Sequence, residues 1–263
     1  MGILNVTPDS FAEAQPLTAP DLAIAAALRM EAEGADLIDI GGESTRPGAE
    51  PVGAKDEIAR LLPVVSGLRG RLRIPISIDT YKSAVADAAL GAGAAMINDV
   101  SGLLYDPELA GAVAARGAAL VLMHTRGRPT AMYEQAEYDD VAGEVAAELQ
   151  ARVDRATAAG VSVDHILVDP GLGFAKRPVH SYGVLARLPE IAAALNRPVL
   201  IGPSRKSFMR EAAGGRAALE RDWATAAAVT AAVLNGAHIV RVHAVAEMVQ
   251  VVNTAEEIRR QAR

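Results

Sequence analysis

The sequence predicts an α/β protein, a (β/α)8 TIM barrel that forms a single domain over residues 1–263. Short apolar runs alternate with longer amphipathic segments along the whole chain. The short runs are apolar throughout, which is typical of parallel strands covered on both faces. The length of 263 residues also matches the roughly 250 residues that such a barrel needs.

The elements follow one another as strand and helix, without a linker or a low-complexity tract between them. The expected strands are 2–6, 37–40, 74–78, 95–97, 119–123, 165–168, 199–201 and 239–242. The expected helices are 19–33, 54–69, 82–91, 107–116, 138–159, 181–195, 219–236 and 245–261.

Local signals support the helix ends. Thr18 before Pro20, and Asp106 before Pro107, are expected N-caps. Glycine is expected to end several helices, at Gly34, Gly117, Gly160 and Gly236. An open, doubly wound sheet is the rival fold. It usually needs fewer strands, and the first turn, NVTPDS, lacks a glycine-rich phosphate fingerprint. We therefore favour the closed barrel.

Composition excludes several function classes. A net charge of -6 and a pI near 5.4 argue against a nucleic-acid partner, which selects a basic surface. The chain has no cysteine, which excludes disulfides, thiolate metal sites and a cysteine nucleophile. No apolar run approaches the ~20 residues that cross a bilayer, and the first residues do not resemble a signal peptide. We expect a cytoplasmic protein without a membrane partner.

Polar side chains stand where each expected strand runs into the next loop. In a barrel of this kind the active site lies at the C-terminal ends of the strands. One such residue is more often a cap or a loop tie than a ligand-binding group. A polar group at every strand end is better explained by a binding pocket. The strand-end residues are Asn5, Asp39, Asp79, Asn98, Asp99, His124, Asp169, Ser204, Arg205, Lys206, Arg241 and His243.

These residues divide by chemistry into two groups. Asp79, Asn98 and Asp169 offer acceptors that suit a flat heterocycle rich in N–H donors. Lys206, Arg241 and His243 are cationic or can become so, and they suit a phosphate-type group. His124 has no H-x-x-x-H or cysteine partner, and we interpret it as a structural residue outside the catalytic set.

Eight ordered blocks of the chain resemble the dihydropteroate synthases, the pterin-binding TIM-barrel family of folate biosynthesis that sulfonamides inhibit. They span nearly the whole chain and are chemically distinct, which makes the resemblance specific. The blocks are GILNVTPDSF (2–11), DIGGESTRPGA (39–49), SIDTYK (77–82), INDVSG (97–102), LMHTRG (122–127), DPGLGFAK (169–176), SRKSF (204–208) and RVH (241–243).

The resemblance implies a transferase reaction assisted by Mg²⁺. p-Aminobenzoate attacks the exocyclic methylene of 6-hydroxymethyl-7,8-dihydropterin diphosphate, and 7,8-dihydropteroate and diphosphate leave. The arylamine is already a nucleophile at neutral pH, so no strong protein base is required. The family resemblance also implies a homodimer, formed through helices on the far side of the barrel.

Matching by motif position carries the family's residue roles onto this chain. The implied pterin ligands are Asp79, Asn98, Asp169 and Lys206. The implied diphosphate ligands are Thr45, Arg46, Arg241 and His243, and the implied metal ligand is Asn5. The implied p-aminobenzoate site is formed by Phe174, Ser207 and Arg46. We place Asp79, Asp169, Lys206 and Arg46 in the catalytic set.

Two departures from the family pattern keep alternatives open. Ala12-Glu13-Ala14-Gln15 replaces a glycine-containing loop, and Ala244 replaces an aspartate. A non-catalytic pterin-binding paralogue is therefore the second hypothesis. A methyltetrahydrofolate-dependent methyltransferase barrel is a third, less favoured because it does not need the blocks around 39–49, 204–208 and 241–243.

Overall fold

The strands of the chain form a closed parallel ring, as the sequence predicts. The computed structural model describes residues 1–7, 19–44, 51–128 and 132–262. The strands are β1 (Gly2–Asn5), β2 (Ile38–Gly41), β3 (Ile76–Asp79), β4 (Met96–Asp99), β5 (Ala119–Met123), β6 (Ile166–Asp169), β7 (Leu200–Ile201) and β8 (Ile239–Val240). Strands β1 to β6 pair in sequence order, and β7 pairs with β8.

Two isolated bridges close the ring between these sheets. Val168 of β6 pairs with Val199 before β7, and Gly2 of β1 pairs with Val242 after β8. The amide of Ile3 donates to the Val242 carbonyl at 2.9 Å, so the first and last strands are joined by backbone hydrogen bonds. A closed ring leaves no strand edge that needs covering.

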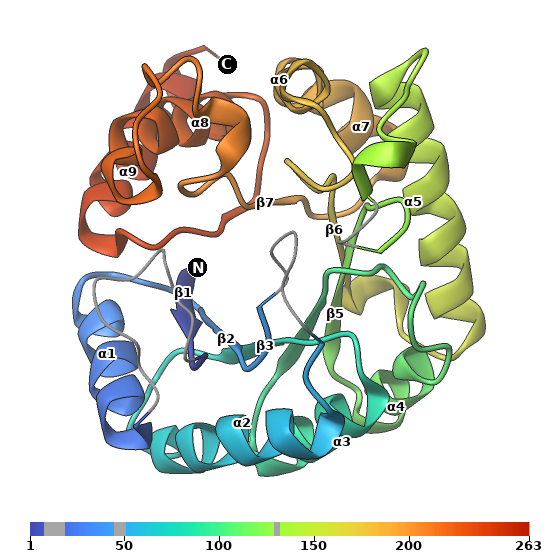
Figure 1. The fold of residues 1–263 in the computed structure, drawn as a ribbon, viewed down its shortest axis with the longest axis vertical. Helices are drawn as coiled ribbons and strands as arrows, with labels where there is room; N and C mark the ends of the chain where they lie inside the picture. Colours follow the sequence, from blue (N-terminus) through green and yellow to red (C-terminus); the bar gives the residue numbers. More distant parts are fainter. Residues whose placement is uncertain (8–18, 45–50, 129–131, 263) are drawn as a thin grey trace.

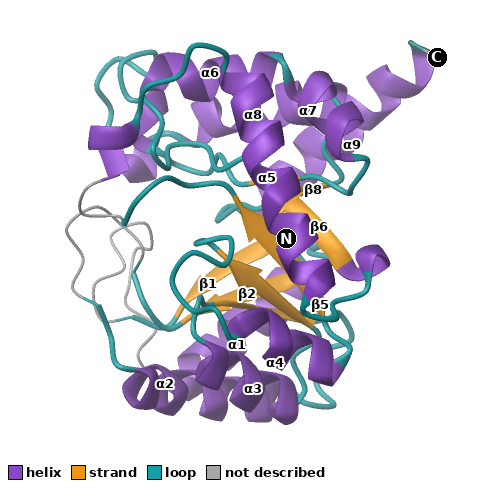
Figure 2. Cartoon of the chain, turned by 90° about the vertical axis from the view of Figure 1, so that its right-hand side faces the viewer, coloured by secondary structure: helices purple, strands orange, loops and turns teal. Residues whose placement is uncertain are grey.

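Helices surround the ring, as Figure 1 shows, and Figure 2 shows the strands enclosed between helical layers. The helices are α1 (Pro20–Ala32), α2 (Ala54–Leu68), α3 (Ser83–Ala92), α4 (Leu109–Arg116), α5 (Val141–Ala158), α6 (Pro178–Ala186), α7 (Leu188–Leu195), α8 (Asp222–Leu234) and α9 (Val245–Gln261). Short 3-10 turns, which the sequence reading missed, occur at Met132–Gln135, Val163–His165, Ser207–Met209 and Ala218–Glu220. No helix in the described part of the chain has the length and apolarity to span a membrane.

The helix ends differ from the prediction in several places. Thr18, the expected N-cap of α1, lies outside the described residues, and Ala19 stands at the N-cap position. The helix expected from residue 219 begins at Asp222. The single helix expected at 181–195 is two helices, α6 and α7, which meet at Arg187. Pro189 explains the break, because proline has no amide hydrogen and cannot continue the helix that precedes it. Asp106 does not cap a helix at 107, because α4 begins at Leu109. Its carboxylate instead accepts hydrogen bonds from the amides of Ser83 at 2.7 Å and Glu108 at 2.9 Å.

The barrel interior is apolar at one end and polar at the other. Met1, Leu37, Val121 and Leu200 form an apolar cluster at the N-terminal end of the strands. Side chains two residues apart on a strand face the same side. Leu37 of the cluster, and Met96, Leu167 and Ile239, which pack against it, lie two positions before Asp39, Asn98, Asp169 and Arg241. These four polar residues therefore also point inward. A separate, larger apolar core fills the space between the strands and the helices.

The turn after β6 packs directly against the end of β5. Gly171 has φ +71°, and a Cβ atom there would lie 1.9 Å from the carbonyl oxygen of His124. Only glycine allows this approach, because a neighbouring backbone cannot move as a flexible side chain can.

We expect Gly171→Ala to lower the free energy of unfolding by about 3 kcal/mol or more, since overpacking strain adds to the backbone cost. Gly214→Ala is the matched control. Gly214 has φ +69° and open space around its Cβ position, so it isolates the cost of the left-handed backbone, about 1 kcal/mol. Urea unfolding of both variants measures the difference, and equal losses would contradict the close packing described here.

Candidate active site

A pocket of about 530 Å³ opens at the C-terminal ends of the strands. Its lining includes every predicted site residue that the structure describes: Asn5, Asp79, Asn98, Asp169, Phe174, Lys206, Ser207, Arg241 and His243. Thr45 and Arg46 lie outside the described residues. Elements from both halves of the chain thus bring their polar ends to one cavity, as a barrel requires.

One wall of the pocket is a buried group of acids around a single arginine. The Arg241 guanidinium donates through Nε to Asp39 at 2.6 Å and through Nη2 to Asp79 at 2.9 Å. The Asn98 amide also donates to Asp39, at 3.0 Å. Asp39 is fully buried and does not line the pocket, but it accepts hydrogen bonds from Arg241 and Asn98, which do. The sequence reading noted Asp39 at a strand end but did not assign it a role.

The two carboxylates differ from ordinary buried acids because each keeps an unused oxygen. Oδ1 of Asp39 and Oδ1 of Asp79 are buried and accept no hydrogen bond. Leaving such an acceptor unpaired is unfavourable, so a donor from a ligand that reaches it is stabilising. Burial raises the pKa of Asp79 to about 7, although Arg241 opposes the shift. Because Asp79 lines the pocket, its free oxygen is available to a ring N–H group.

A half-buried lysine also lines the pocket. Lys206 Nζ donates to the Leu172 carbonyl at 2.6 Å and lies 4.6 Å from the centre of the Phe174 ring. Burial lowers the pKa of Lys206 to about 8, and the nearby Asp169 opposes that shift. Asp169 accepts a hydrogen bond from the Gly171 amide at 2.8 Å, and burial raises its pKa in spite of Lys206. A carboxylate and an amine that face the same cavity can bind both donors and acceptors on one ring.

The loops after β7 and β8 meet at a third side of the pocket. Ser204 Oγ lies 2.8 Å from His243 Nδ1 and accepts the His243 amide hydrogen bond at 3.1 Å. Ser204, Arg205 and Arg221 line the pocket beside the predicted Ser207 and His243. Arg221 is buried, and its guanidinium donates to the carbonyls of Arg205 and Arg216 at 2.8 and 2.9 Å. The sequence reading missed Arg221, because its position in an alanine-rich helical stretch gives no signal.

The loop after β2 is anchored by an ion-pair cluster that the sequence reading also missed. Glu43 lines the pocket and accepts a hydrogen bond from the Tyr81 hydroxyl at 2.7 Å. The Lys82 ammonium pairs with Glu43 and with Glu57, a buried residue of α2. Tyr81 and Lys82 belong to the SIDTYK block, but no local pattern links them to Glu43 and Glu57, which lie 38 and 25 positions away from Tyr81 and Lys82 respectively.

The chain belongs to the pterin-binding enzymes. The model of that family matches residues 1–243. The dihydropteroate synthase of Synechocystis is 45% identical over 98% of this chain and 89% of its own length. That of Mycobacterium leprae is 46% identical over 92% of this chain and 87% of its own. These relatives place the chain among the dihydropteroate synthases, the transferases of folate biosynthesis.

Solved structures agree with this family assignment. A Yersinia pestis dihydropteroate synthase in complex with a sulfonamide drug superposes with a TM-score of 0.94 and is 40% identical, over 98% of this chain and 93% of that one. A Burkholderia cenocepacia dihydropteroate synthase complexed with 7,8-dihydropteroate gives a TM-score of 0.89 and is 45% identical, over 100% of this chain and 91% of that one. Some relatives are longer: the chain spans 36% of the Schizosaccharomyces pombe folic acid synthesis protein, to which it is 44% identical.

The raised pKa of Asp79 predicts a pH effect on stability. An unfolded aspartate has a pKa of about 4. Between about pH 4 and the folded pKa of about 7, the folded chain holds a proton that the unfolded chain has lost. The stability that Asp79 contributes is therefore full below about pH 4 and is lost as the pH rises through about 7. Asp79→Asn removes this dependence, so its stability relative to the wild type should increase from pH 4 to pH 7.

Chemical denaturation across that pH range measures the effect. Ser77→Ala is the matched control, because Ser77 is buried on the same strand, carries an unpaired oxygen and does not titrate there. The difference in the free energy of unfolding between Ser77→Ala and the wild type should not change with pH. If the free energy of unfolding of Asp79→Asn also differs from that of the wild type by the same amount at every pH, the raised pKa of Asp79 would be contradicted.

Proposed function

We propose that this pocket condenses 6-hydroxymethyl-7,8-dihydropterin diphosphate with p-aminobenzoate, giving 7,8-dihydropteroate and diphosphate. One observation carries the proposal: the unpaired carboxylate oxygen of Asp79 and the cationic side chains of Lys206 and Arg241 belong to the lining of one cavity at the strand ends. A polar ring and a diphosphate on the same substrate need both kinds of group at a fixed separation. The barrel provides that separation because different strands carry the two kinds.

The pterin ring is assigned to the walls that contain Asp79, Asn98, Asp169 and Lys206. Two adjacent N–H donors on the ring match carboxylate acceptors such as the unused Oδ1 of Asp79. Lys206, a donor, matches the ring's carbonyl and ring-nitrogen acceptors. We infer that ionised Asp79 and Asp169 also stabilise positive charge on the methylene as the diphosphate departs.

The diphosphate is assigned to Thr45, Arg46, Arg241 and His243. Negative charge on this group grows as the carbon–oxygen bond breaks, so fixed cations stabilise the transition state more than the bound substrate. In the described structure Arg241 is already paired with Asp39 and Asp79, and its diphosphate role stays a prediction. His243 is oriented by its two contacts with Ser204, which point to Ser204 as an additional positioning group.

p-Aminobenzoate is assigned to the side of the pocket formed by Phe174 and Ser207, with Arg46 beside it. The Phe174 ring offers an apolar surface for the aromatic ring of the substrate. The Ser207 hydroxyl is a donor for its carboxylate. The arylamine attacks the methylene with its own lone pair, and the pocket has only to orient it.

Mg²⁺ is assigned to Asn5, whose position at the end of β1 puts it in the pocket lining. Among the described residues no group of three acids or histidines is arranged to hold a metal ion. One amide oxygen fits Mg²⁺ all the same, because Mg²⁺ commonly uses few protein ligands together with substrate phosphates and water. When bound, the ion would neutralise charge on the departing diphosphate.

Product formation tests the function directly. The purified chain should convert the two substrates into 7,8-dihydropteroate with Mg²⁺ present and much more slowly with EDTA. A folded protein that binds the pterin but forms no product would instead support the non-catalytic paralogue.

Lys206→Ala and Asp169→Asn should each reduce turnover at least about a hundredfold, because each removes a buried polar contact at the reacting ring. Both should keep the fold, which circular dichroism checks, since neither side chain belongs to the apolar core. Near-normal kinetics in both variants would contradict the assignment of the pocket.

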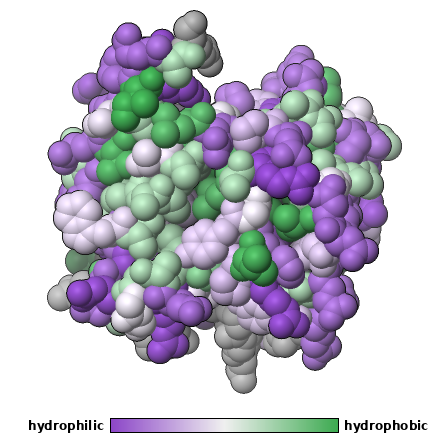
Figure 3. All heavy atoms as spheres, turned by 90° about the horizontal axis from the view of Figure 1, so that it is seen from above, coloured by the Kyte–Doolittle hydropathy of each residue, from purple (hydrophilic) through white to green (hydrophobic). Residues whose placement is uncertain are grey.

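We also propose that the chain is a cytoplasmic homodimer that buries the outer surfaces of α8 and α9. Trp223 of α8 is 89% exposed, and Leu234 of α8 and Ile258 of α9 are 40% and 53% exposed. Figure 3 looks onto the side of the molecule that carries α6 and α8 in Figure 1, and apolar side chains gather there. Exposed apolar groups on this scale favour an interface.

Trp223→Glu should shift the chain from a species of about twice 27.3 kDa to a monomer of 27.3 kDa in analytical ultracentrifugation. A charge placed in an apolar interface loses its hydration without gaining a partner. Val163→Glu is the control, because Val163 is 40% exposed but lies in the turn before β6. Equal sedimentation of the wild type and both variants would contradict the proposed interface.

A further inference from the structure

The loop after β6 is held by side chains from three parts of the chain. The carbonyl of Leu172 accepts from Lys206 at 2.6 Å, that of Phe174 from Lys176 at 3.2 Å, and that of Ala175 from the Tyr138 hydroxyl at 2.9 Å. The backbone between these bonds is unusual: Gly171, Gly173 and Ala175 all have left-handed φ angles. Such a conformation persists only where surrounding contacts fix it.

Lys176 is the least ordinary member of this group, because its side chain is only 1% exposed. No carboxylate among the described residues forms an ion pair with it. Its Nζ instead contacts His124 Nδ1 at 2.7 Å as well as the Phe174 carbonyl. Burial lowers the pKa of Lys176 well below its usual value, which favours the uncharged amine in this position.

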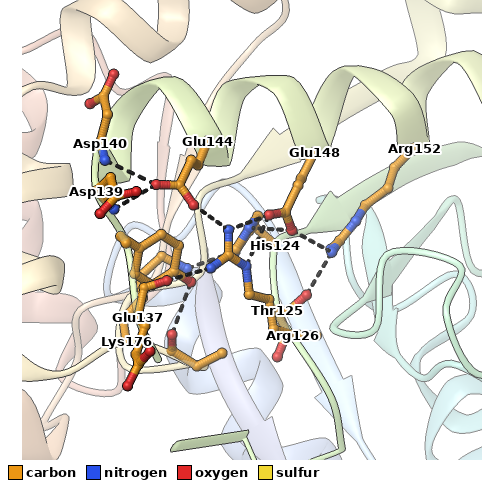
Figure 4. A network of polar contacts seen from close by, with 12 residues as sticks. His124, Thr125, Arg126, Glu137, Asp139, Asp140, Glu144, Glu148, Arg152 and Lys176 are labelled. Atoms are coloured by element: carbon orange, nitrogen blue, oxygen red, sulfur yellow. Dashed lines mark hydrogen bonds and ion pairs between the residues drawn. The ribbon is translucent and has the colours of Figure 1, made fainter. Parts of the chain in front are cut away.

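Contacts behind Lys176 fix the state of His124, as Figure 4 shows. His124 is fully buried, and burial together with Lys176 lowers its pKa to about 3, so the ring is neutral. Because the Glu148 carboxylate of α5, 3.1 Å from Nε2, can only accept, the single ring hydrogen lies on Nε2. Nδ1 is then the acceptor, and the Lys176 amine donates to it. Arg126 pairs with Glu148 and with Glu144 on the same helix.

These contacts form a continuous chain from α5 to the pocket wall. Glu148 orients His124, His124 orients the Lys176 amine, and the amine holds the carbonyl of Phe174. Phe174 lines the pocket, whereas Lys176 and His124 do not. This series of side-chain hydrogen bonds therefore reaches the pocket lining at Phe174. This confirms the structural interpretation of His124 and gives it a more specific purpose.

We propose that Lys176 is a positioning residue for the arylamine half of the site, and that His124 and Tyr138 support it. The inference rests on the proposed assignment of Phe174 to p-aminobenzoate. Leu172, on the same loop, is held separately by Lys206. Loss of the Lys176 bond should therefore displace Phe174 while leaving the Lys206 side of the pocket in place.

Lys176→Met tests this, because methionine has a similar length but no donor for Phe174 or His124. We expect KM for p-aminobenzoate to rise about tenfold, the ratio that corresponds to one net hydrogen bond to a pocket wall. KM for the pterin diphosphate should change less than about twofold. Tyr138→Phe, which removes only the hydroxyl bond to Ala175, should give a smaller shift in the same direction. It carries the test if Lys176→Met does not fold.

Val65→Ala is the matched control for a general loss of stability, because Val65 is buried in α2. It should lower the melting temperature and leave both KM values unchanged. Equal increases of both KM values in Lys176→Met, or no increase in either, would overturn the proposal.

Calorimetric binding separates this inference from the proposed function. Lys176→Met should weaken the binding of pteroate about tenfold, while its affinity for 6-hydroxymethylpterin stays within about twofold of the wild type. Equal weakening of both ligands would overturn the positioning role. If Lys176→Met weakens pteroate binding as expected but the wild type forms no product, the proposed reaction alone would be contradicted.

Discussion

The pairing of Arg241 with Asp39 and Asp79 is the interaction on which the site depends. Two carboxylates buried inside the barrel would repel one another and lose their hydration without a cation between them. Arg241 comes from β8, whereas the acids come from β2 and β3, and a guanidinium can donate to both at once. The pairing therefore requires the ring to close, since only closure brings the last strand beside the first ones.

This pairing does not satisfy the two acids fully, either in charge or in hydrogen bonds. One cation serves two acids, and each acid retains an oxygen without a donor. Burial raises the pKa of Asp79, and the neighbouring Asp39 adds to the shift while Arg241 opposes it. Of the two acids only Asp79 lines the pocket, so its unpaired oxygen is the one that a ligand N–H group can reach.

One buried and two half-buried lysines support the pocket loops. Lys206 faces the cavity and holds Leu172, Lys176 lies behind the same loop and holds Phe174, and Lys82 pairs with Glu43 and Glu57 beside the loop after β2. Each joins a loop to an element that is distant in the sequence. Loops at the mouth of a barrel otherwise have few contacts, so their geometry depends on such bonds. Of the three lysines only Lys206 lines the pocket, and Lys176 and Lys82 support the loops from outside the pocket lining.

The sequence by itself determined the eight-stranded barrel and most of the residues in its pocket. Periodicity is a local property: apolar runs such as 119–123 and the polar residue that ends each run can be read without knowing what packs against them. The partners were decided only in the tertiary structure. Nothing near Arg241 in the sequence points to Asp39, 202 positions away, and nothing marks Arg221 as a pocket residue or Lys176 as the support of Phe174. Hydrogen bonds across a barrel depend on which side chains closure brings within about 3 Å, and no local pattern encodes that distance.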